Sequence, residues 1–103
     1  MIGFEEFSQV FGSAQGEQEF EIYFKDLEKT YMIIKYDDHV SFQSDVSGEV
    51  NYPSLLELYQ TVSVDGICLK DKWNDIDTII AEAMFDLSLP EDLADFVEFT
   101  RYG

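Results

Sequence analysis

The residues in this chain that could do chemistry are overwhelmingly carboxylates, and their excess over basic residues is largest in the last thirty positions. Of 103 residues, 22 are Asp or Glu, six are Lys or Arg and one is His, so the formal net charge is −16. Between 74 and 103, eight acids face a single base, Arg101. Residues at i, i+4 and i+7 share one face of a helix, so Glu91, Asp95 and Glu98 would form one stripe. On one helix alone such an acidic face is usually only solvated, but the excess of acids over the whole chain favours a binding surface.

We therefore expect a partner-binding surface made of the acids in the last helix and in the segment before it. The candidate residues are Glu91, Asp92, Asp95, Glu98, Asp75, Asp77, Glu82 and Asp86. The alternative is that these acids are a solvated face that serves only solubility. A binding surface is favoured because the cations that would normally neutralise the acids are missing over two long stretches. One is 74–103, and the other is 37–66, which has six acids and no base.

No set of residues matches a catalytic site. His39 is the only histidine, and no Ser-His or Cys-His pair can be assigned around it, so we expect it to be structural or exposed. Cys68 lies between apolar residues and is expected to be a small core side chain. Pairs of carboxylates will be close by chance among 22 acids, so they do not indicate acid–base catalysis. The sequence predicts a protein that is not an enzyme.

Oxygen ligands for a divalent cation are the remaining chemical possibility. Two groups could supply them, Asp37 and Asp38 with His39, and Asp71 with Asp75 and Asp77. Neither group has the calcium-loop spacing with its central Gly and terminal Glu. The six glycines are scattered and make no phosphate-binding loop. We therefore expect no functional metal and no cofactor.

Charge and hydropathy exclude several classes of partner. A protein that binds nucleic acid directly needs a basic patch, and six cations among 22 acids do not make one. An anionic membrane would repel the chain, and no apolar run reaches the length of a spanning helix. The N-terminus lacks the pattern of a signal peptide, and a single cysteine allows no internal disulfide. We expect a cytoplasmic protein.

The first half of the chain predicts a helix followed by strands. Apolar residues at helical spacing indicate a helix over 2–11. The period then changes to two, and β-branched and aromatic residues increase. This pattern predicts strands over 20–24, 30–36 and 39–43, with a weaker segment at 48–52 that is either a strand or a loop. The short connections favour antiparallel hairpins.

After Pro53 the pattern becomes helical. Two capping boxes, Ser54-Leu55-Leu56-Glu57 and Ser88-Leu89-Pro90-Glu91, predict the starts of a helix over 54–62 and of the last helix. A single helical turn is expected over 69–73. A further helix is predicted over 76–84, where apolar residues recur at i, i+3, i+4, i+7 and i+8: Ile76, Ile79, Ile80, Ala83 and Met84.

These elements predict an α+β fold in one acidic domain covering 1–103. An antiparallel sheet of three or four strands would follow an N-terminal helix and precede a C-terminal helical half, in the order α-β-β-β(-β)-α-α-α. The helices would cover one face of the sheet.

The leading functional hypothesis is an acidic inhibitor that binds a basic protein partner and occupies the nucleic-acid channel of a nuclease or another nucleic-acid enzyme. In size, charge and lack of catalytic residues, the chain is similar to small acidic nucleic-acid mimics of phages and mobile elements, the anti-restriction and anti-CRISPR proteins. This similarity is one of composition and rests on no motif. Two alternatives are an immunity protein that neutralises a toxin nuclease, and a small structural or adaptor domain whose charge serves solubility. The sequence indicates no oligomeric state.

Overall fold

The structure is a computed structural model that describes residues 2–102. Its elements in chain order are α1 (Phe4–Ser13), β1 (Gln18–Phe24), β2 (Thr30–Lys35), β3 (Val40–Ser44), β4 (Glu49–Tyr52), α2 (Leu55–Gln60), η1 (Val64–Gly66), α3 (Leu69–Lys72), η2 (Trp73–Asp75), β5 (Ile76–Ala81), β6 (Phe85–Asp86) and α4 (Pro90–Tyr102). The strands form one antiparallel sheet in the order β4-β3-β2-β1-β5-β6. The fold is α+β as predicted, but the sheet has six strands, more than the three or four expected.

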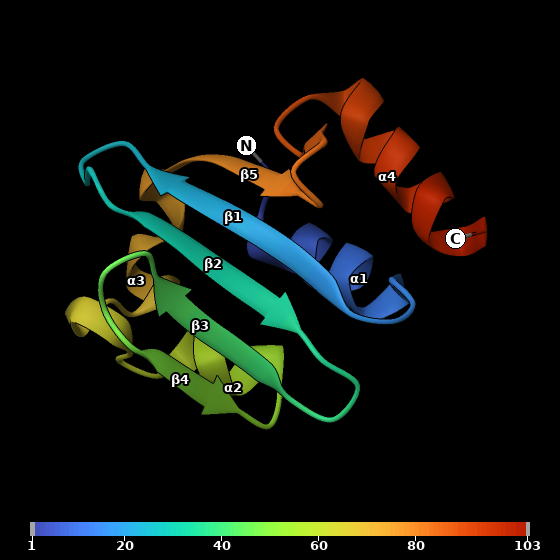
Figure 1. Cartoon of the computed structure of the whole chain (residues 1–103). Helices are drawn as coiled ribbons and strands as arrows, with labels where there is room; N and C mark the ends of the chain where they lie inside the picture. Colours follow the sequence, from blue (N-terminus) through green and yellow to red (C-terminus); the bar gives the residue numbers. More distant parts are fainter. Residues whose placement is uncertain (1, 103) are drawn as a thin grey trace.

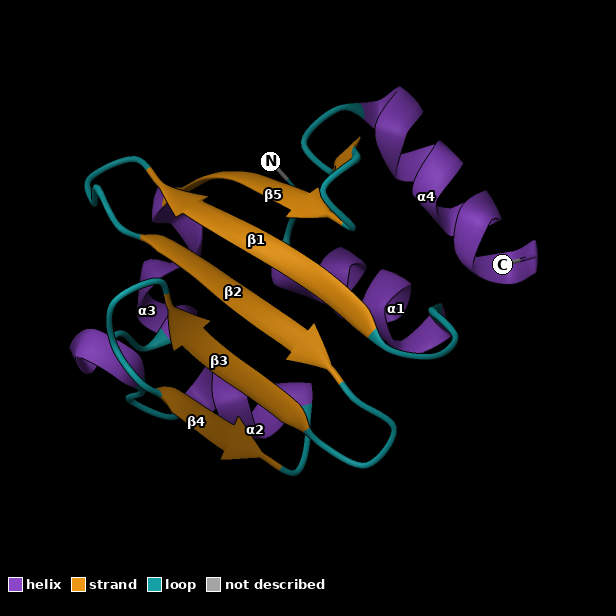
Figure 2. Cartoon of the chain, in the orientation of Figure 1, coloured by secondary structure: helices purple, strands orange, loops and turns teal. Residues whose placement is uncertain are grey.

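The helices gather on one face of this sheet (Figure 1). α1, α2 and α3 lie behind the strands, and α4 stands beside the edge formed by β5 and β6. The Phe20 ring on β1 contacts both Phe7 of α1, with ring centroids 5.3 Å apart, and Phe96 of α4, at 5.7 Å. Within the described residues, no helix crosses the opposite face of the sheet (Figure 2).

The strands of the first half form where the period of two predicts them. Along β1 the side chains of Phe20, Ile22 and Phe24 are buried, while those between them are exposed or half-buried. Ile22 pairs with Tyr31 of β2, which places a further buried ring on the same face. The segment 48–52, left open between strand and loop, is the strand β4 at the edge of the sheet.

The predicted helix over 76–84 is wrong, because Ile76–Ala81 is the strand β5, paired with β1. The register shifts at one point, since Phe24 pairs with Ile76 but Tyr23 pairs with Thr78. One extra residue in a strand is a β-bulge, and it puts the buried positions at 76, 79 and 81. The spacing of three residues between Ile76 and Ile79 is the same as that between neighbours on one face of a helix. The many β-branched residues of this segment favour a strand, and the helix-like periodicity obscured that preference.

Local capping explains where the helices of the second half begin. The Ser54 hydroxyl accepts a hydrogen bond from the Glu57 backbone N–H at 3.2 Å and starts α2, as the first capping box predicts. The last helix, α4, begins at Pro90, within the motif that was predicted to open it, but the second capping box does not form, because the Ser88 hydroxyl donates to the carboxylate of Asp86. A different carboxylate, that of Asp92, binds the hairpin before α4. The predicted single turn over 69–73 corresponds to α3.

The core lies between the sheet and the helices and is rich in aromatic rings. The buried apolar side chains come from every helix and from β1, β2, β3 and β5: Phe7, Phe11, Ala14, Phe20, Ile22, Phe24, Tyr31, Ile33, Val40, Phe42, Leu55, Leu58, Val64, Ile67, Leu69, Trp73, Ile76, Ile79, Ala81, Leu87 and Phe96. This packing fixes α4 and the short strand β6 against the end of β5, where most of the candidate acids lie.

Candidate functional site

Six of the eight candidate acids come together on α4 and on the hairpin that precedes it. We call this group the α4–hairpin surface and define it by Glu82, Asp86, Glu91, Asp92, Asp95 and Glu98. On α4, Glu91, Asp95 and Glu98 are exposed, and Phe96 and Thr100 on the opposite side are buried. The helical spacing therefore forms the stripe that the sequence predicts, and the stripe faces solvent.

The hairpin between β5 and β6 is held in an unusual backbone conformation. Glu82 and Ala83 have φ angles of 53° and 57°, and the Met84 N–H donates to the Ala81 carbonyl at 3.1 Å. Positive φ at both central residues is the conformation of a type I′ turn, which usually takes Asn-Gly. The Glu82 carboxylate accepts a hydrogen bond from the Glu19 N–H of β1 at 3.1 Å. This contact ties the turn to the sheet and keeps the Glu82 charge at its edge.

Two further acids of the surface also have structural partners. The Asp92 Oδ2 atom accepts a hydrogen bond from the Asp86 N–H at 3.0 Å, and Asp86 Oδ1 accepts one from the Ser88 N–H at 2.9 Å. Both side chains are half-buried. Asp86 and Asp92 therefore hold α4 against β6 and leave the three acids of the helical stripe free to meet a partner.

Four of the six cations lie at the opposite end of the sheet, which we call the groove end. It consists of the β1–β2 turn (25–29), the β3–β4 turn (45–48) and the segment 61–75. These four cations are Lys25, Lys29, Lys70 and Lys72. Among the described residues, the ion pairs of Lys and Arg join Lys29 to Asp65, and Lys72 to Asp26 and Asp75. None of these pairs involves the α4–hairpin surface.

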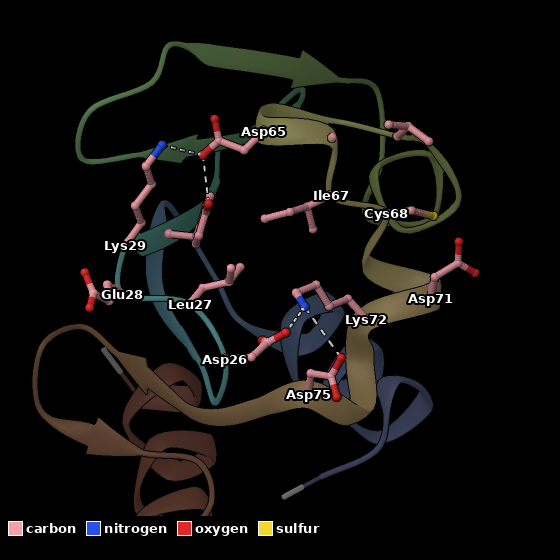
Figure 3. A pocket seen from close by; sticks show the side chains of 13 residues that line it. Asp26, Leu27, Glu28, Lys29, Asp65, Ile67, Cys68, Asp71, Lys72 and Asp75 are labelled. Atoms are coloured by element: carbon pink, nitrogen blue, oxygen red, sulfur yellow. Dashed lines mark hydrogen bonds and ion pairs between the residues drawn. The ribbon is translucent and has the colours of Figure 1, made fainter.

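The groove end contains an open groove of about 920 Å³, lined by acids and lysines from the β1–β2 turn, η1 and α3 (Figure 3). Lys72 Nζ lies 2.7 Å from Asp26 Oδ2 and 3.5 Å from Asp75 Oδ2. The hydrogen bond and the charge of Lys72 hold the pKa of Asp26 below its ordinary value. Three of the five carboxylates that line the groove already pair with Lys29 or Lys72, whereas the acids of the α4 stripe face solvent without such pairs, so this groove is the weaker candidate site.

A second network in the groove centres on Asp65. Its carboxylate accepts hydrogen bonds from the Tyr31 hydroxyl at 2.7 Å, from Ser47 Oγ at 2.8 Å and from Lys29 Nζ at 3.2 Å. These bonds hold the pKa of Asp65 below its ordinary value. Burial, together with the facing Asp65 carboxylate, raises the pKa of Tyr31 to about 12. Because Tyr31 is 2% exposed, the network joins η1 to the core of the sheet.

The structure places the remaining two candidate acids, Asp75 and Asp77, away from the other six. Asp75 ends η2 and Asp77 is the second residue of β5, whereas Glu82 follows the last residue of that strand. Six residues of strand span about 17 Å from first to last Cα. Asp75 belongs to the groove end, where it pairs with Lys72.

His39 lies outside both areas, whereas Cys68 is one of the residues that line the groove. His39 Nδ1 is 2.6 Å from Asp38 Oδ1, and its ring stacks on Tyr36 with centroids 4.4 Å apart. Cys68 is half-buried, rather than fully in the core as expected, and its thiol contacts the Tyr59 carbonyl at 3.7 Å. Over residues 2–102, no three His, Cys, Asp or Glu side chains are arranged to hold a metal ion.

Sequence reasoning missed apolar residues beside the acids. Met84, Leu89 and Phe99 are exposed by 66%, 50% and 43% of their surfaces, and all three belong to α4 or to the chain leading into it. Helical spacing puts Phe99 about 80° from Glu91, between the acidic stripe and the buried side of α4. That projection was available from the sequence, whereas the exposure of Met84 depends on the hairpin that replaced the predicted helix.

Comparison with protein-family models, with curated proteins and with solved structures found no match to this chain. In the part of the chain that the structure describes, no helix has the length and apolar character needed to cross a membrane. The candidate site therefore rests on the geometry and charge of the protein itself.

Proposed function

We propose that this protein is an acidic inhibitor that binds a nuclease or another nucleic-acid enzyme through the α4–hairpin surface and occupies its basic channel. It acts by binding and catalyses no reaction. The observation that carries the proposal is the separation of charge along the sheet. Within the described residues, the six acids at α4 and the hairpin make no ion pair with Lys or Arg, whereas the groove end combines its six acids with four of the six cations and with the lysine ion pairs.

This separation suits electrostatic recognition. Channels that handle nucleic acid are positively charged grooves, and a surface of opposite sign gains both faster encounter and correct orientation. The stripe of Glu91, Asp95 and Glu98 spans about 10 Å along the helix at 1.5 Å per residue. Duplex DNA carries one charge per about 1.7 Å, so the stripe alone is sparser than DNA. Asp92 on the same helix, and Asp86 bound to it, add charge next to the stripe.

The experiment that tests the proposal is capture of partners from a bacterial lysate on the immobilised protein. Bound proteins are eluted first with a salt gradient and then with excess DNA, and mass spectrometry identifies them. We expect a nuclease or another nucleic-acid enzyme that elutes both with moderate salt and with DNA. Its activity should be inhibited by this protein, and excess nucleic acid should relieve the inhibition.

Two outcomes would replace the proposal with one of its alternatives. A single toxin nuclease that resists both eluents, with no effect of this protein on unrelated nucleic-acid enzymes, would identify an immunity protein. A failure to retain any basic protein even at low salt would mean that the charge serves solubility in a structural or adaptor domain.

A further inference from the structure

The acidic surface also exposes large apolar side chains. Met84 at the tip of the hairpin is 66% exposed, Leu89 just before α4 is 50% exposed, and Phe99 on α4 is 43% exposed. Glu82, Asp86 and Asp95 are near them in the same hairpin and helix. Among the exposed large apolar side chains of the described residues, Phe99 is the one phenylalanine, and it lies on the same helix as the acidic stripe.

Phe99 is a fixed apolar contact rather than a loose side chain. Its ring lies 5.3 Å from the Phe85 ring of β6 and 6.5 Å from the Phe96 ring of α4, measured between centroids. Phe96 in turn contacts Phe20 in the core at 5.7 Å. The exposed ring is thus the outer member of an aromatic series that begins inside the protein. Little side-chain entropy remains to be lost when such a ring meets a partner.

The hairpin holds Met84 out from the sheet at a cost in backbone energy. Glu82 and Ala83 are both in the left-handed region, with φ angles of 53° and 57°. Residues other than glycine are strained in that region, because the Cβ atom approaches the following carbonyl oxygen. The turn persists because the Met84 N–H binds the Ala81 carbonyl and the Glu82 carboxylate binds the Glu19 N–H. Strain of this kind is concentrated at functional sites.

We propose that the α4–hairpin surface docks into a protein groove whose cations surround exposed aromatic or apolar side chains, with Phe99 and Met84 in contact with that apolar part. This proposal rests on the proposed function and specifies the partner. Grooves for single-stranded nucleic acid have this composition, because bases stack there on aromatic side chains between basic residues. Phe99 would then take the place of a base, and the acids that of the phosphates.

The charge of the surface selects this occupant over others. A second copy of the chain also carries −16, so like charges oppose self-association through this surface. Nucleic acid and anionic lipid are repelled for the same reason. A purely polar polycation would leave Phe99 and Met84 in water, whereas a basic groove with apolar side chains would bury them.

Two synthetic peptides of equal length and equal charge test the proposal. One alternates Arg and Gly, and the other has tryptophan in place of two of the glycines. Binding of each to the intact protein is measured at about 10 mM salt, where screening is weak, by calorimetry and by the NMR shifts of backbone amides. We expect the tryptophan peptide to bind about tenfold more tightly, as a single well-placed apolar contact provides. Its largest additional shifts should fall at Met84 and Phe99.

Serine variants show which residues provide the additional affinity for the tryptophan peptide. Phe99→Ser and, separately, Met84→Ser should each reduce the preference for the tryptophan peptide, and Met84 is exposed enough that its variant should fold. The matched control is Leu56→Ser, because Leu56 is 54% exposed on α2, which packs under β3 and β4 at the other edge of the sheet. That control should keep the full preference.

The proposal is overturned if the two peptides bind equally, if the preference survives both variants, or if Leu56→Ser removes it. Equal binding of both peptides with shifts on α4 would leave the proposed function standing while removing the apolar contact. If neither peptide binds at low salt, the acidic surface itself does not attract cationic partners, and the proposed function fails as well.

Discussion

The Asp92 carboxylate accepts a 3.0 Å hydrogen bond from the backbone N–H of Asp86, so that one acid of α4 holds the strand that carries another. Asp92 sits in the first turn of the helix, where a negative charge is also favoured by the helix dipole. Its neighbours in the stripe, Glu91 and Asp95, point to solvent. Acids that are adjacent in sequence thus divide between holding the fold and meeting a partner.

This division predicts that two similar substitutions differ in how much they lower the stability of the protein. Asp92→Ala leaves the Asp86 N–H without its partner and should lower the free energy of unfolding by about 1–2 kcal/mol. Asp95→Ala removes an exposed charge and should change stability by less than about 0.5 kcal/mol. Urea unfolding of both variants measures the difference. Equal stability of the two variants would show that Asp92 contributes no structural bond.

The left-handed hairpin predicts that Ala83→Gly stabilises the protein. Ala83 has a φ of 57°, a region that glycine occupies without strain, so we expect a gain of about 0.5–1 kcal/mol. The control is the same substitution in the exposed helix position Ala94, which should lose about 1 kcal/mol because glycine disfavours helix interiors. Thermal unfolding of the two variants should shift in opposite directions, and a loss at both positions would contradict the assigned conformation of the turn.

Lys35 is the one lysine that contacts the end of α1. Its Nζ donates to the Phe11 carbonyl at 2.7 Å and to the Ala14 carbonyl at 2.6 Å, and burial lowers its pKa. Lys35→Met should destabilise the protein by about 1–3 kcal/mol, since these carbonyls lose charged donors. The exposed Lys25→Met removes the same charge without such bonds and should stay within about 0.5 kcal/mol of the parent. Equal losses would indicate that net charge alone is responsible.

The network at Asp65 predicts a stability that depends on pH in acid. Hydrogen bonds from Tyr31, Ser47 and Lys29 lower the pKa of Asp65 from its ordinary value of 3.8. A lowered pKa in the folded state stabilises the protein above the pKa of the unfolded chain, and this contribution is lost as the pH falls through the folded pKa. The free-energy difference between the parent protein and Asp65→Asn should therefore shrink below about pH 4.

Asparagine suits this test because it tolerates the φ of 56° at position 65. The comparison is made by urea unfolding between neutral and acid pH. A difference that stays constant over that range would contradict a structural role for the Asp65 charge. Tyr31→Phe removes the donor at 2.7 Å and should weaken the acid dependence in the same direction.

The sequence predicted the elements whose residues follow one simple period. β1 alternates buried and exposed side chains over its whole length, and α4 places Phe96 and Thr100 opposite Glu91 and Asp95. β5 was missed because a bulge spaces Ile76 and Ile79 by three, which imitates a helix. Periodicity alone cannot distinguish a bulged strand from a helix in this segment, and only its pairing with β1 shows that it is a strand.

The candidate surface was predictable as far as the helix is regular. The stripe on α4 follows from spacing, whereas the place of Asp75 depends on the direction in which β5 runs. A helix over 76–84 would have put Asp75 and Asp77 near the other acids, but the strand places Asp75 in the groove end and Asp77 at the start of β5, away from the other six. The backbone contact of Asp92 and the exposure of Met84 depend on tertiary structure, which no single segment encodes.

A basic enzyme should be bound through the α4–hairpin surface rather than by non-specific attraction to the total charge of the protein. Two variants of equal net charge distinguish these possibilities. One reverses the stripe with Glu91→Lys, Asp95→Lys and Glu98→Lys, and the other reverses exposed acids of the groove end with Glu28→Lys, Asp45→Lys and Asp71→Lys. Each is used to capture nucleic-acid enzymes from a lysate beside the parent protein, with elution by DNA. The stripe variant should lose the captured enzyme, and the groove-end variant should retain it. Equal retention or equal loss by the two variants would contradict binding through the α4–hairpin surface.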